Sequence, residues 1–328
     1  MNNFFQIKDL NKVVIFGVCP NIAEILNINS KLKLDTLIIA SPKQKKKIDK
    51  KIKINTFKVL EDKFEIFINQ NCQIERTLFL SVSALFIFKK RQIQFLKNNL
   101  INYFPSRLPY DAGRGGFSWH IMREDKILNN TFHIIDEGIN TGSIIFEDAK
   151  IFPTYCKIPI DYENFKWIEM NKFYQTFIKK IIKQEKFLLT KQNNSLGRYN
   201  PSLNTLKNGF IDWSMTSYDL YNFINAFDDP FIGASTFLNR QGFGRLFIKK
   251  VHLHGGDTGN HSFFSGIISR QCQDWITVST EGKHMLLIEE VLNSKGENVL
   301  RELNVGDRFF TPLKYIEKSK STQIFYRP

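Results

Sequence analysis

Residues 100–146 decide the fold, with the sequence LINYFPSRLPYDAGRGGFSWHIMREDKILNNTFHIIDEGINTGSIIF. They start within a strand-like run, residues 99–104, and pass through a glycine-rich loop into a helical segment, residues 117–123. A second strand-like run, residues 131–135, leads into the loop at residues 136–142. Strands that alternate with helical segments predict a parallel sheet with right-handed crossovers, and such sheets bind ligands beyond the carboxyl ends of their strands.

Three continuous apolar runs precede this stretch: KVVIFG at residues 12–17, DTLIIAS at residues 35–41 and TLFLSVSALFIF at residues 77–88. Runs without polar alternation are typical of parallel strands buried on both faces. After the stretch, residues 163–186 have a helical pattern rich in Phe, Ile and Lys, which is expected to cover one face of the sheet. Residues 191–207 are polar and contain Gly and Pro, so they are expected to form an interdomain linker.

The C-terminal part predicts a small β-barrel. An amphipathic helix is expected at residues 217–227, and Asp-Asp-Pro at residues 228–230 should stop it. Five short strand-like runs, separated mostly by Gly and polar residues, then predict a barrel of the OB type. From Lys314 onward the chain is expected to form a basic, frayed tail. The five runs are residues 234–238, 245–252, 264–268, 275–279 and 285–291.

The composition is that of an ordinary globular protein, with 42% hydrophobic and 24% charged residues among 328. No apolar run is long enough to span a bilayer, and the first residues lack a signal-peptide layout. A cytoplasmic protein without a membrane partner is therefore expected. The four cysteines are scattered and show no metal-binding spacing, so reduced thiols and no metal site are expected.

The net charge of +14 favours an anionic partner such as nucleic acid or a diphosphate. The chain is also rich in Lys, Ile, Asn and Phe, and an A/T-rich coding bias explains part of this charge. Lysines concentrate in residues 42–54, between Lys43 and Lys53. This run is interpreted either as a loop that contacts phosphate or RNA, or as a solvated helix face or mobile loop.

Three motifs resemble those of the formyltransferases that use 10-formyltetrahydrofolate, a family that includes methionyl-tRNA and sugar N-formyltransferases. The motifs are SRLP at residues 106–109, DEGINTG at residues 136–142 and NGFIDW at residues 208–213. The resemblance implies an α/β fold, with a Rossmann-like, mostly parallel sheet (the formyltransferase fold) followed by a small OB-like β-barrel. It places a catalytic-type domain at residues 1–200 and the barrel at residues 201–328.

The resemblance also assigns the catalytic positions. Asn102 corresponds to the Asn of the family's Asn-x-His motif, whose side-chain amide would donate a hydrogen bond to the formyl oxygen. Phe104 stands where the family has its His, and Asn140 stands where it has its catalytic Asp. His133 lies on the strand before the second motif, where some family members also have a His, and Asp136 is a further candidate for proton transfer.

Three interpretations of the altered pair follow. In the first, His133 or a carboxylate of the 136–142 loop moves the proton. In the second, positioning and the Asn102 amide suffice, with water as the proton carrier. In the third, the protein binds ligand without transferring a formyl group. Removal of a His leaves its Asp partner as an unpaired buried charge, so Phe104 and Asn140 are expected to occur together, which favours the last two interpretations.

By resemblance, the formyl donor is 10-formyltetrahydrofolate and the acceptor is an amine. The preferred acceptor is a nucleotide-linked amino sugar, because the C-terminal motifs look closer to homologues associated with surface sugars than to the tRNA enzymes. Methionyl-tRNA is the alternative acceptor, and a homodimer is left open. Arg107, Tyr110 and Arg114 are expected to contact the substrate, because an Arg fork matches phosphate oxygens. The residues expected to bind folate are Leu85, Phe86, Ile87, Asp136, Glu137, Gly138 and Ile139.

Overall fold

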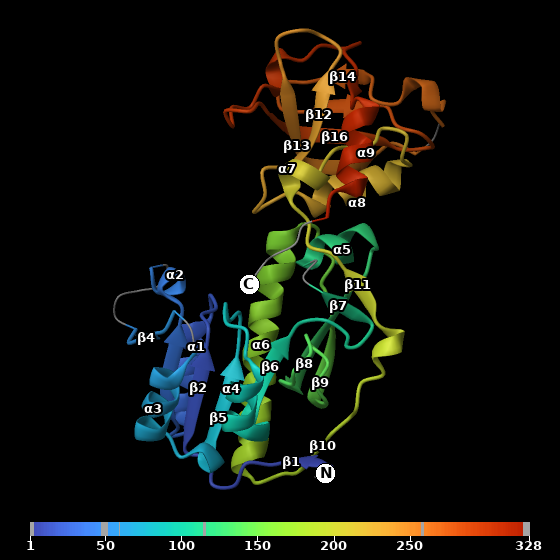
Figure 1. Ribbon diagram of the computed structural model, residues 1–328. Helices are drawn as coiled ribbons and strands as arrows, with labels where there is room; N and C mark the ends of the chain where they lie inside the picture. The colour runs from blue at the N-terminus through green and yellow to red at the C-terminus, as the bar shows by residue number, and fades with distance from the viewer. Residues whose placement is uncertain (1–2, 47–51, 59, 114–115, 257–258, 324–328) are drawn as a thin grey trace.

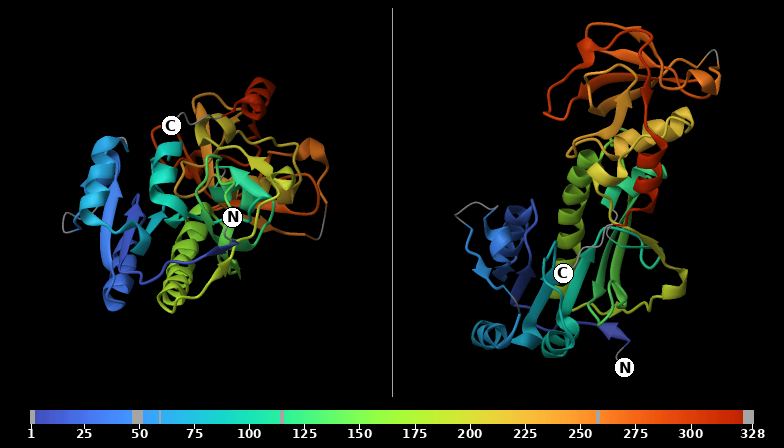
Figure 2. Two further views of the ribbon diagram at one scale, coloured as in Figure 1. Left: turned by 60° about the horizontal axis from the view of Figure 1, so that its bottom comes forward. Right: turned by 45° about the horizontal axis from the view of Figure 1, so that its top comes forward.

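The computed structural model describes residues 3–46, 52–58, 60–113, 116–256 and 259–323. Its two main parts are a mixed α/β region and a smaller β region, which lie at opposite ends of the molecule (Figure 1). The long helix α6 (Pro159–Ile182) extends from the α/β region towards the β region. The right-hand view of Figure 2 shows the β region, in orange and red, beyond the upper end of this helix.

The larger sheet has seven strands among the described residues. They are β2 (Lys12–Phe16), β3 (Asp35–Ala40), β4 (Asn55–Thr56), β5 (Thr77–Ser81), β6 (Leu100–Phe104), β8 (Ile127–Ile134) and β9 (Ile144–Ile151). Their order is β4-β3-β2-β5-β6-β8-β9. The first five run parallel, whereas β8 and β9 are antiparallel to their neighbours. The mostly parallel sheet confirms the predicted fold, and its inner strands β2, β3 and β5 lie within the three apolar runs. The third run is only partly strand, because β5 ends at Ser81 and the following residues include the exposed Leu85 and Ile87.

Helices cover both faces of this sheet because its inner strands are apolar on both sides. Val13 and Ile15 of β2 pack towards α1 and α6, while Val14 and Phe16 pack towards α3 and α4. Successive side chains of a strand point to opposite faces, so one continuous apolar run supplies two cores. The helices of this region are α1 (Ile22–Lys31), α2 (Pro42–Lys45), α3 (Asp62–Asn71), α4 (Lys90–Leu96), α5 (Gly116–Met122) and α6.

Two small sheets tie the ends of the α/β region together. β1 (Phe4–Phe5) pairs antiparallel with β10 (Phe187–Leu188), which follows α6. β7 (Asp111–Gly113) pairs parallel with β11 (Arg198–Asn200). The segment that leads into the β region, residues 191–207, is therefore partly ordered by strand pairing rather than a free linker.

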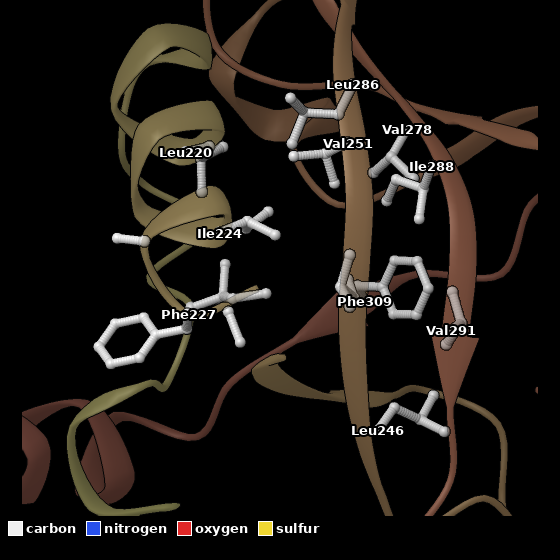
Figure 3. Close-up of a cluster of buried hydrophobic side chains, with 14 of the residues drawn as sticks. Leu220, Ile224, Phe227, Leu246, Val251, Val278, Leu286, Ile288, Val291 and Phe309 are labelled. Atoms are coloured by element: carbon white, nitrogen blue, oxygen red, sulfur yellow. The ribbon is translucent and has the colours of Figure 1, made fainter. Parts of the chain in front are cut away.

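The β region is a closed, antiparallel barrel. Its strands are β12 (Ala234–Leu238), β13 (Arg245–His254), β14 (Ile268–Gln271), β15 (Ile276–Val278), β16 (Met285–Leu292) and β17 (Phe309–Phe310). They follow the order β14-β15-β16-β13-β12-β17, and a bridge between Ile267 and Arg308 joins the two ends. Among the described residues, helices α7 (Thr205–Asn208), α8 (Ser217–Ala226) and α9 (Leu313–Ser321) accompany the barrel. Helix α8 packs Leu220 and Ile224 against the barrel core (Figure 3).

One hydrophobic cluster, separate from the two cores that flank the large sheet, spans both regions. Phe117 and Ile121 of α5 belong to the same buried cluster as Ile224 of α8 and the barrel strands. The Ser118 hydroxyl also donates a hydrogen bond of 2.8 Å to the carbonyl oxygen of Ala226. We keep residues 1–200 and 201–328 as the proposed division, although the contact between them is a packed one. Within the described residues, no helix has the length and apolar character needed to cross a membrane.

Several predicted elements differ from the structure. The strand expected at residues 264–268 begins only at Ile268, because residues 262–264 form a 3-10 turn. The tail expected from Lys314 is largely helix α9, whose Ile316 is buried, and Tyr315 stacks on Phe237 of β12. In the lysine run, helix α2 has a Ser41 cap, and residues 47–51 lie outside the described residues.

Candidate active site

A pocket of about 350 Å³ opens at the carboxyl ends of β5 and β6. The loop after β5, the end of β6, the loop at residues 135–140 and helix α6 surround it. This is the edge of a parallel sheet at which helix and strand connections leave room for a ligand. Its walls include Ser83, Phe86, Ile87, Phe88, Asn102, Phe104, His133, Asp136, Glu137, Gly138, Ile139, Asn140, Lys166 and Trp167.

Asn102 and His133 are direct neighbours because β6 and β8 pair in this register. His133 Nδ1 lies 2.8 Å from the carbonyl oxygen of Ile134. A carbonyl oxygen can only accept, so Nδ1 carries the proton and Nε2 is left as an acceptor. The Asn102 side-chain amide donates to this Nε2 at 3.1 Å. The register of the sheet therefore fixes both the tautomer of His133 and the orientation of Asn102.

The imidazole of His133 is neutral at neutral pH. Burial lowers its pKa from the usual value, while its hydrogen bonds with Ile134 and Asn140 and the charge of Asp136 oppose this effect only in part. The residue is 2% exposed. A neutral imidazole with a free basic nitrogen can accept a proton, provided that the Asn102 amide moves off that nitrogen.

Asn140 completes a cluster of three side chains. Its Oδ1 accepts from the Asn102 amide at 3.5 Å, which is longer than a strong N–H···O bond. One N–H of Asn102 is thus only weakly engaged and remains available to a ligand oxygen. The predicted trio of Asn102, His133 and Asn140 is brought together in one pocket.

The loop that carries Asn140 is held by its own side chains. The Asp136 carboxylate accepts hydrogen bonds from the Thr141 hydroxyl at 2.6 Å and from the Gly138 N–H at 3.1 Å. At Gly142 a Cβ atom would lie 1.9 Å from the carbonyl oxygen of Ile134, so this position requires glycine. Asp136 therefore acts first as a structural group of the loop, with its two bonds directed within it.

The apolar wall comes from the loop after β5. Of the residues expected to bind folate, Phe86 and Ile87 line the pocket, whereas Leu85 is not among its lining residues. Ile139, on the opposite loop, is 79% exposed and presents an aliphatic surface at the pocket mouth. Glu137 forms an exposed ion pair of 3.1 Å with Lys90, which links the two loops.

Phe104 occupies the same pocket. It lies two residues beyond Asn102 on β6, so both side chains project from the same face of the strand. The ring is half-buried and faces the pocket rather than the core. An aromatic hydrocarbon can neither take up nor release a proton, so this position supplies shape and apolar contact only.

The predicted substrate residues lie elsewhere. Arg107 and Tyr110 line a second, open hollow of about 620 Å³, whose walls also include Glu147, Asp148 and Gln192. The Arg107 guanidinium stacks on the Tyr110 ring at 4.4 Å. Arg114 lies outside the described residues. Arg107 and Tyr110 are thus not among the lining residues of the pocket that holds Asn102.

Sequence reasoning missed two pocket residues on α6, Lys166 and Trp167. Lys166 is 6% exposed, pairs with Glu163, and its ammonium lies 3.9 Å from the centre of the Trp167 ring. Burial lowers its pKa, against the effect of Glu163. A signal was present, because Lys166 falls in the buried stripe that runs from Tyr162 to Phe177 at helical spacing. A lysine in an apolar stripe indicates a buried ammonium group that other side chains must stabilise.

Within the described parts of the chain, no group of three or more His, Cys, Asp and Glu side chains is placed to hold a metal ion. The polar side chains of the pocket include amides, one neutral imidazole, one lysine and the hydroxyls of Ser81 and Ser83, with carboxylates on the loop. Such a set can donate hydrogen bonds to a developing oxyanion and can exchange a proton.

The chain resembles known proteins in both regions. Residues 205–303 match the family described as formyl transferase, C-terminal domain. A methionyl-tRNA formyltransferase of Clostridium perfringens is 25% identical over 205 residues, which are 62% of this chain and 63% of that protein. The chain thus spans less than two thirds of the length of this curated relative.

Two solved structures share the fold. An N-formyltransferase from Helicobacter canadensis, in complex with folinic acid and dTDP-3-aminofucose, has a TM-score of 0.59 and 19% identity. It covers 85% of this chain and 99% of its own. WlaRD, a sugar 3N-formyl transferase in the presence of dTDP and 5-N-formyl-THF, has a TM-score of 0.58 and 18% identity. It covers 86% of this chain and 97% of its own.

A Rossmann-like sheet joined to an OB-like barrel, with a pocket at the carboxyl edge of the sheet, defines the formyltransferase fold. The chain has this fold, its residues 205–303 match the C-terminal domain of formyl transferases, and its sequence is similar to methionyl-tRNA formyltransferases.

Proposed function

We propose that this protein transfers a formyl group from a reduced folate, 10-formyltetrahydrofolate, to the amine of a nucleotide-linked amino sugar. The observation that carries the proposal is the cluster of Asn102, His133 and Asn140 within one pocket at the sheet edge. When bound, the folate supplies the formyl group. In the reaction, a new bond joins the amine nitrogen to the formyl carbon, the folate N–C bond breaks, and one proton moves from the amine nitrogen to the folate nitrogen.

Asn102 is proposed to stabilise the charge that develops on the formyl oxygen. His133 Nε2 holds one of its N–H groups, while the other is engaged only by the long contact to Asn140. That second N–H can turn to a ligand oxygen without breaking a strong bond. A single well-placed donor of this kind contributes roughly 3–4 kcal/mol to the stabilisation of an oxyanion.

His133 is proposed to carry the proton. It is neutral, its Nε2 is basic, and the carbonyl of Ile134 anchors its other nitrogen. For His133 to accept a proton, Asn102 must release Nε2, which it does when its amide turns to the formyl oxygen. One movement of the Asn102 amide thus prepares both groups. Replacement of a group that transfers the proton typically lowers the rate by about 10²–10⁴-fold.

The residues that line the pocket support the binding of a folate. Phe86, Ile87 and Phe88 offer apolar surface to a flat ring, and residues 136–140 line the pocket from a second loop. These contacts do not depend on a His–Asp pair. Donor binding is therefore expected to persist although Phe104 and Asn140 occupy the family's catalytic positions.

The sugar acceptor is supported by two observations. One solved neighbour is described as a sugar 3N-formyl transferase, and the other is an N-formyltransferase in complex with dTDP-3-aminofucose. In addition, residues 201–328 contain 14 Lys and Arg against 13 Asp and Glu, so the barrel is nearly neutral. An RNA-binding barrel would be expected to be basic, because phosphate contacts dominate RNA affinity. Arg107 and Tyr110 in the second hollow are proposed to contact a phosphate of the acceptor.

Methionyl-tRNA is the second candidate acceptor. The curated relative from Clostridium perfringens is a methionyl-tRNA formyltransferase. The N-terminal 200 residues hold 32 Lys and Arg against 19 Asp and Glu, so nearly all of the net charge lies there. Binding to tRNA whose affinity falls steeply between 50 and 200 mM salt, by about 10³-fold or more, would favour this candidate.

The third candidate is a homologue that binds ligand without turnover. Phe104 and Asn140 favour it, because the pocket cluster lacks the charged pair that would hold an imidazole protonated. The variant Phe104→His with Asn140→Asp restores that pair. Activity that appears only in this double variant, with wild-type donor affinity unchanged in calorimetry, would establish the non-catalytic candidate.

The deciding experiment is a mass-spectrometric assay with 10-formyltetrahydrofolate and a panel of amino-sugar nucleotides. We expect one sugar nucleotide to give a product in which a formyl group replaces one hydrogen of the amine, and which is heavier by the corresponding mass. In the same assay, His133→Gln should lose most of the activity, and full activity in that variant would remove His133 as the proton carrier. No product with any sugar, together with formylation of methionyl-tRNA, would overturn the sugar acceptor.

We further propose a cytoplasmic location, a role in surface polysaccharide synthesis, and a homodimer. Sedimentation can test the homodimer.

A further inference from the structure

Gln192 contacts the loop of Asn140 directly. Its side-chain amide donates hydrogen bonds to the carbonyl oxygens of Asn140, at 3.0 Å, and of Gly142, at 2.6 Å. Gln192 lies 50 residues beyond this loop in the sequence, in the segment that leads from the α/β region to the barrel. One amide group thus bridges the two carbonyls that flank the turn after Asn140.

The backbone next to Gln192 is itself fixed to the sheet. Thr190 forms a bridge with Ile144, the first residue of β9, through two hydrogen bonds of 2.9 Å each. Ile144 follows Asn140 by only four residues. The position of the Gln192 side chain is therefore set by strand pairing two residues away, and its amide is a rigid support rather than a surface contact.

The turn at Asn140 leaves a carbonyl for such a support. Asn140 has a φ angle of +59°, in the left-handed region that Asn adopts more readily than most residues, and surrounding contacts still decide how this turn is held. Asp136 fixes the Thr141 hydroxyl and the Gly138 N–H, but neither of these bonds engages the carbonyl of Asn140. Gln192 supplies the hydrogen bond to that carbonyl.

Gln192 also faces the second hollow. It lines the hollow together with Arg107 and Tyr110, whereas Asn140 lines the pocket of Asn102. The Gln192–Asn140 contact therefore forms part of the wall between the two spaces. The Oε1 atom of Gln192 is buried and has no hydrogen-bond partner among the described residues. It is an acceptor that a donor group in the hollow could satisfy.

We propose that Gln192 is a positioning residue that holds Asn140 in place for the reaction and connects the second hollow to the pocket of Asn102. This role rests on the proposed formyl transfer. Displacement of Asn140 would move the weak acceptor of the Asn102 amide, and with it the direction of the N–H meant for the formyl oxygen. Small errors in such geometry can lower rates by up to about 10²-fold.

The test compares two substitutions of similar length. Gln192→Glu cannot donate, and its carboxylate would face two carbonyl oxygens, whereas Gln192→Lys retains donors to both. Gln241→Glu, at an exposed position in the loop between β12 and β13, is the matched control for the change in charge. The readouts are kcat and KM for the amino-sugar nucleotide, calorimetry with a 5-formyl folate, thermal midpoint, and hydrogen exchange of peptides that cover residues 136–142.

For Gln192→Glu we expect faster exchange in residues 136–142 and a kcat lowered about 10–100-fold, with KM changed much less. Gln192→Lys should restore both values, and Gln241→Glu should match the wild type. Unchanged exchange and unchanged kcat in Gln192→Glu would overturn the proposal, as would equal damage in Gln192→Lys. If the wild type transfers no formyl group, the proposed function fails, and exchange of the loop still decides whether Gln192 holds it.

Discussion

Two buried polar clusters of this molecule differ in charge and in how completely they are bonded. In the pocket, Asn102, His133 and Asn140 are all neutral, and their contacts measure 3.1 and 3.5 Å. At the base of the barrel, Lys249 is charged and forms ion pairs of 2.5 Å with Asp229 and 3.5 Å with Asp228. Both clusters contain side chains that are nearly inaccessible to solvent.

The barrel cluster uses most of its bonding capacity internally. Asp228 is 1% exposed and also accepts the backbone N–H groups of Asp229, at 2.6 Å, and of Lys250, at 2.8 Å. Burial alone would lower the pKa of Lys249, but the hydrogen bond with Asp229 and the charges of both carboxylates raise it. The pocket cluster keeps a weakly used N–H and a basic nitrogen. Full internal satisfaction indicates a structural role, and spare capacity next to a cavity indicates a ligand site.

The largest effect is expected from Asn102→Ala, which removes the donor from the pocket cluster. Turnover should fall about 10²–10³-fold, because a lost oxyanion donor is not replaced. Unfolding free energy should change by only about 1 kcal/mol, since both former partners are neutral. Steady-state kinetics and urea unfolding measure the two values. A variant that keeps its rate would show that the formyl oxygen is stabilised elsewhere.

The barrel cluster should show the opposite pattern in Lys249→Met. Removal of the ammonium leaves the buried Asp228 without its charge partner, which typically destabilises by about 3 kcal/mol. Activity per folded molecule should stay within about twofold of wild type, because the cluster lies outside the pocket lining. Adding Asp228→Asn should recover part of the stability. A loss of kcat without loss of stability would contradict the structural role.

The sequence could predict the fold because its signals are local. The apolar run at residues 12–17 and the first five residues of the run at 77–88 form the inner strands β2 and β5, and the bounds of β12 agree residue by residue. The site was partly predictable for the same reason. Asn102 lies near the carboxyl end of a parallel strand, where ligands of such sheets bind, and Asn140 lies in a recognisable motif. The antiparallel pairing of β8 with β6, which places His133 opposite Asn102 next to the Asn140 loop, was not predicted.

The remaining parts depend on packing that the sequence pattern does not contain. Gln192 reaches the Asn140 loop through a long-range bridge at Thr190, and no local motif marks it. Helix α9 was interpreted as a frayed tail because its lysines hide the two buried positions, Ile316 and Ser319. Lys166 was hidden for the reverse reason, since a charged residue on an amphipathic helix is ordinarily assigned to the solvent face.

The smallest predicted effect is the pH dependence of stability that His133 gives to the pocket cluster. Burial lowers the pKa of His133 in the folded protein below the value of about 6.5 that the unfolded chain retains. Above this pH the imidazole is neutral in both the folded and the unfolded state, so it contributes no pH dependence to the free energy of unfolding. As the pH falls through it, the unfolded chain takes up the proton first, so stability is lost until the folded pKa is passed.

His133→Gln keeps a neutral acceptor for Asn102 but cannot titrate. Between pH 7.5 and 5 its unfolding free energy should therefore decline less than that of the wild type, by an amount smaller than the effect of Lys249→Met. His120, which is also buried with a lowered pKa, titrates in both proteins and cancels in the comparison. Urea unfolding at several pH values measures the difference. Parallel curves would mean that folding leaves the pKa of His133 unchanged, and a steeper decline in His133→Gln would mean that folding raises it. Either result would contradict the lowered pKa of His133 in the pocket cluster.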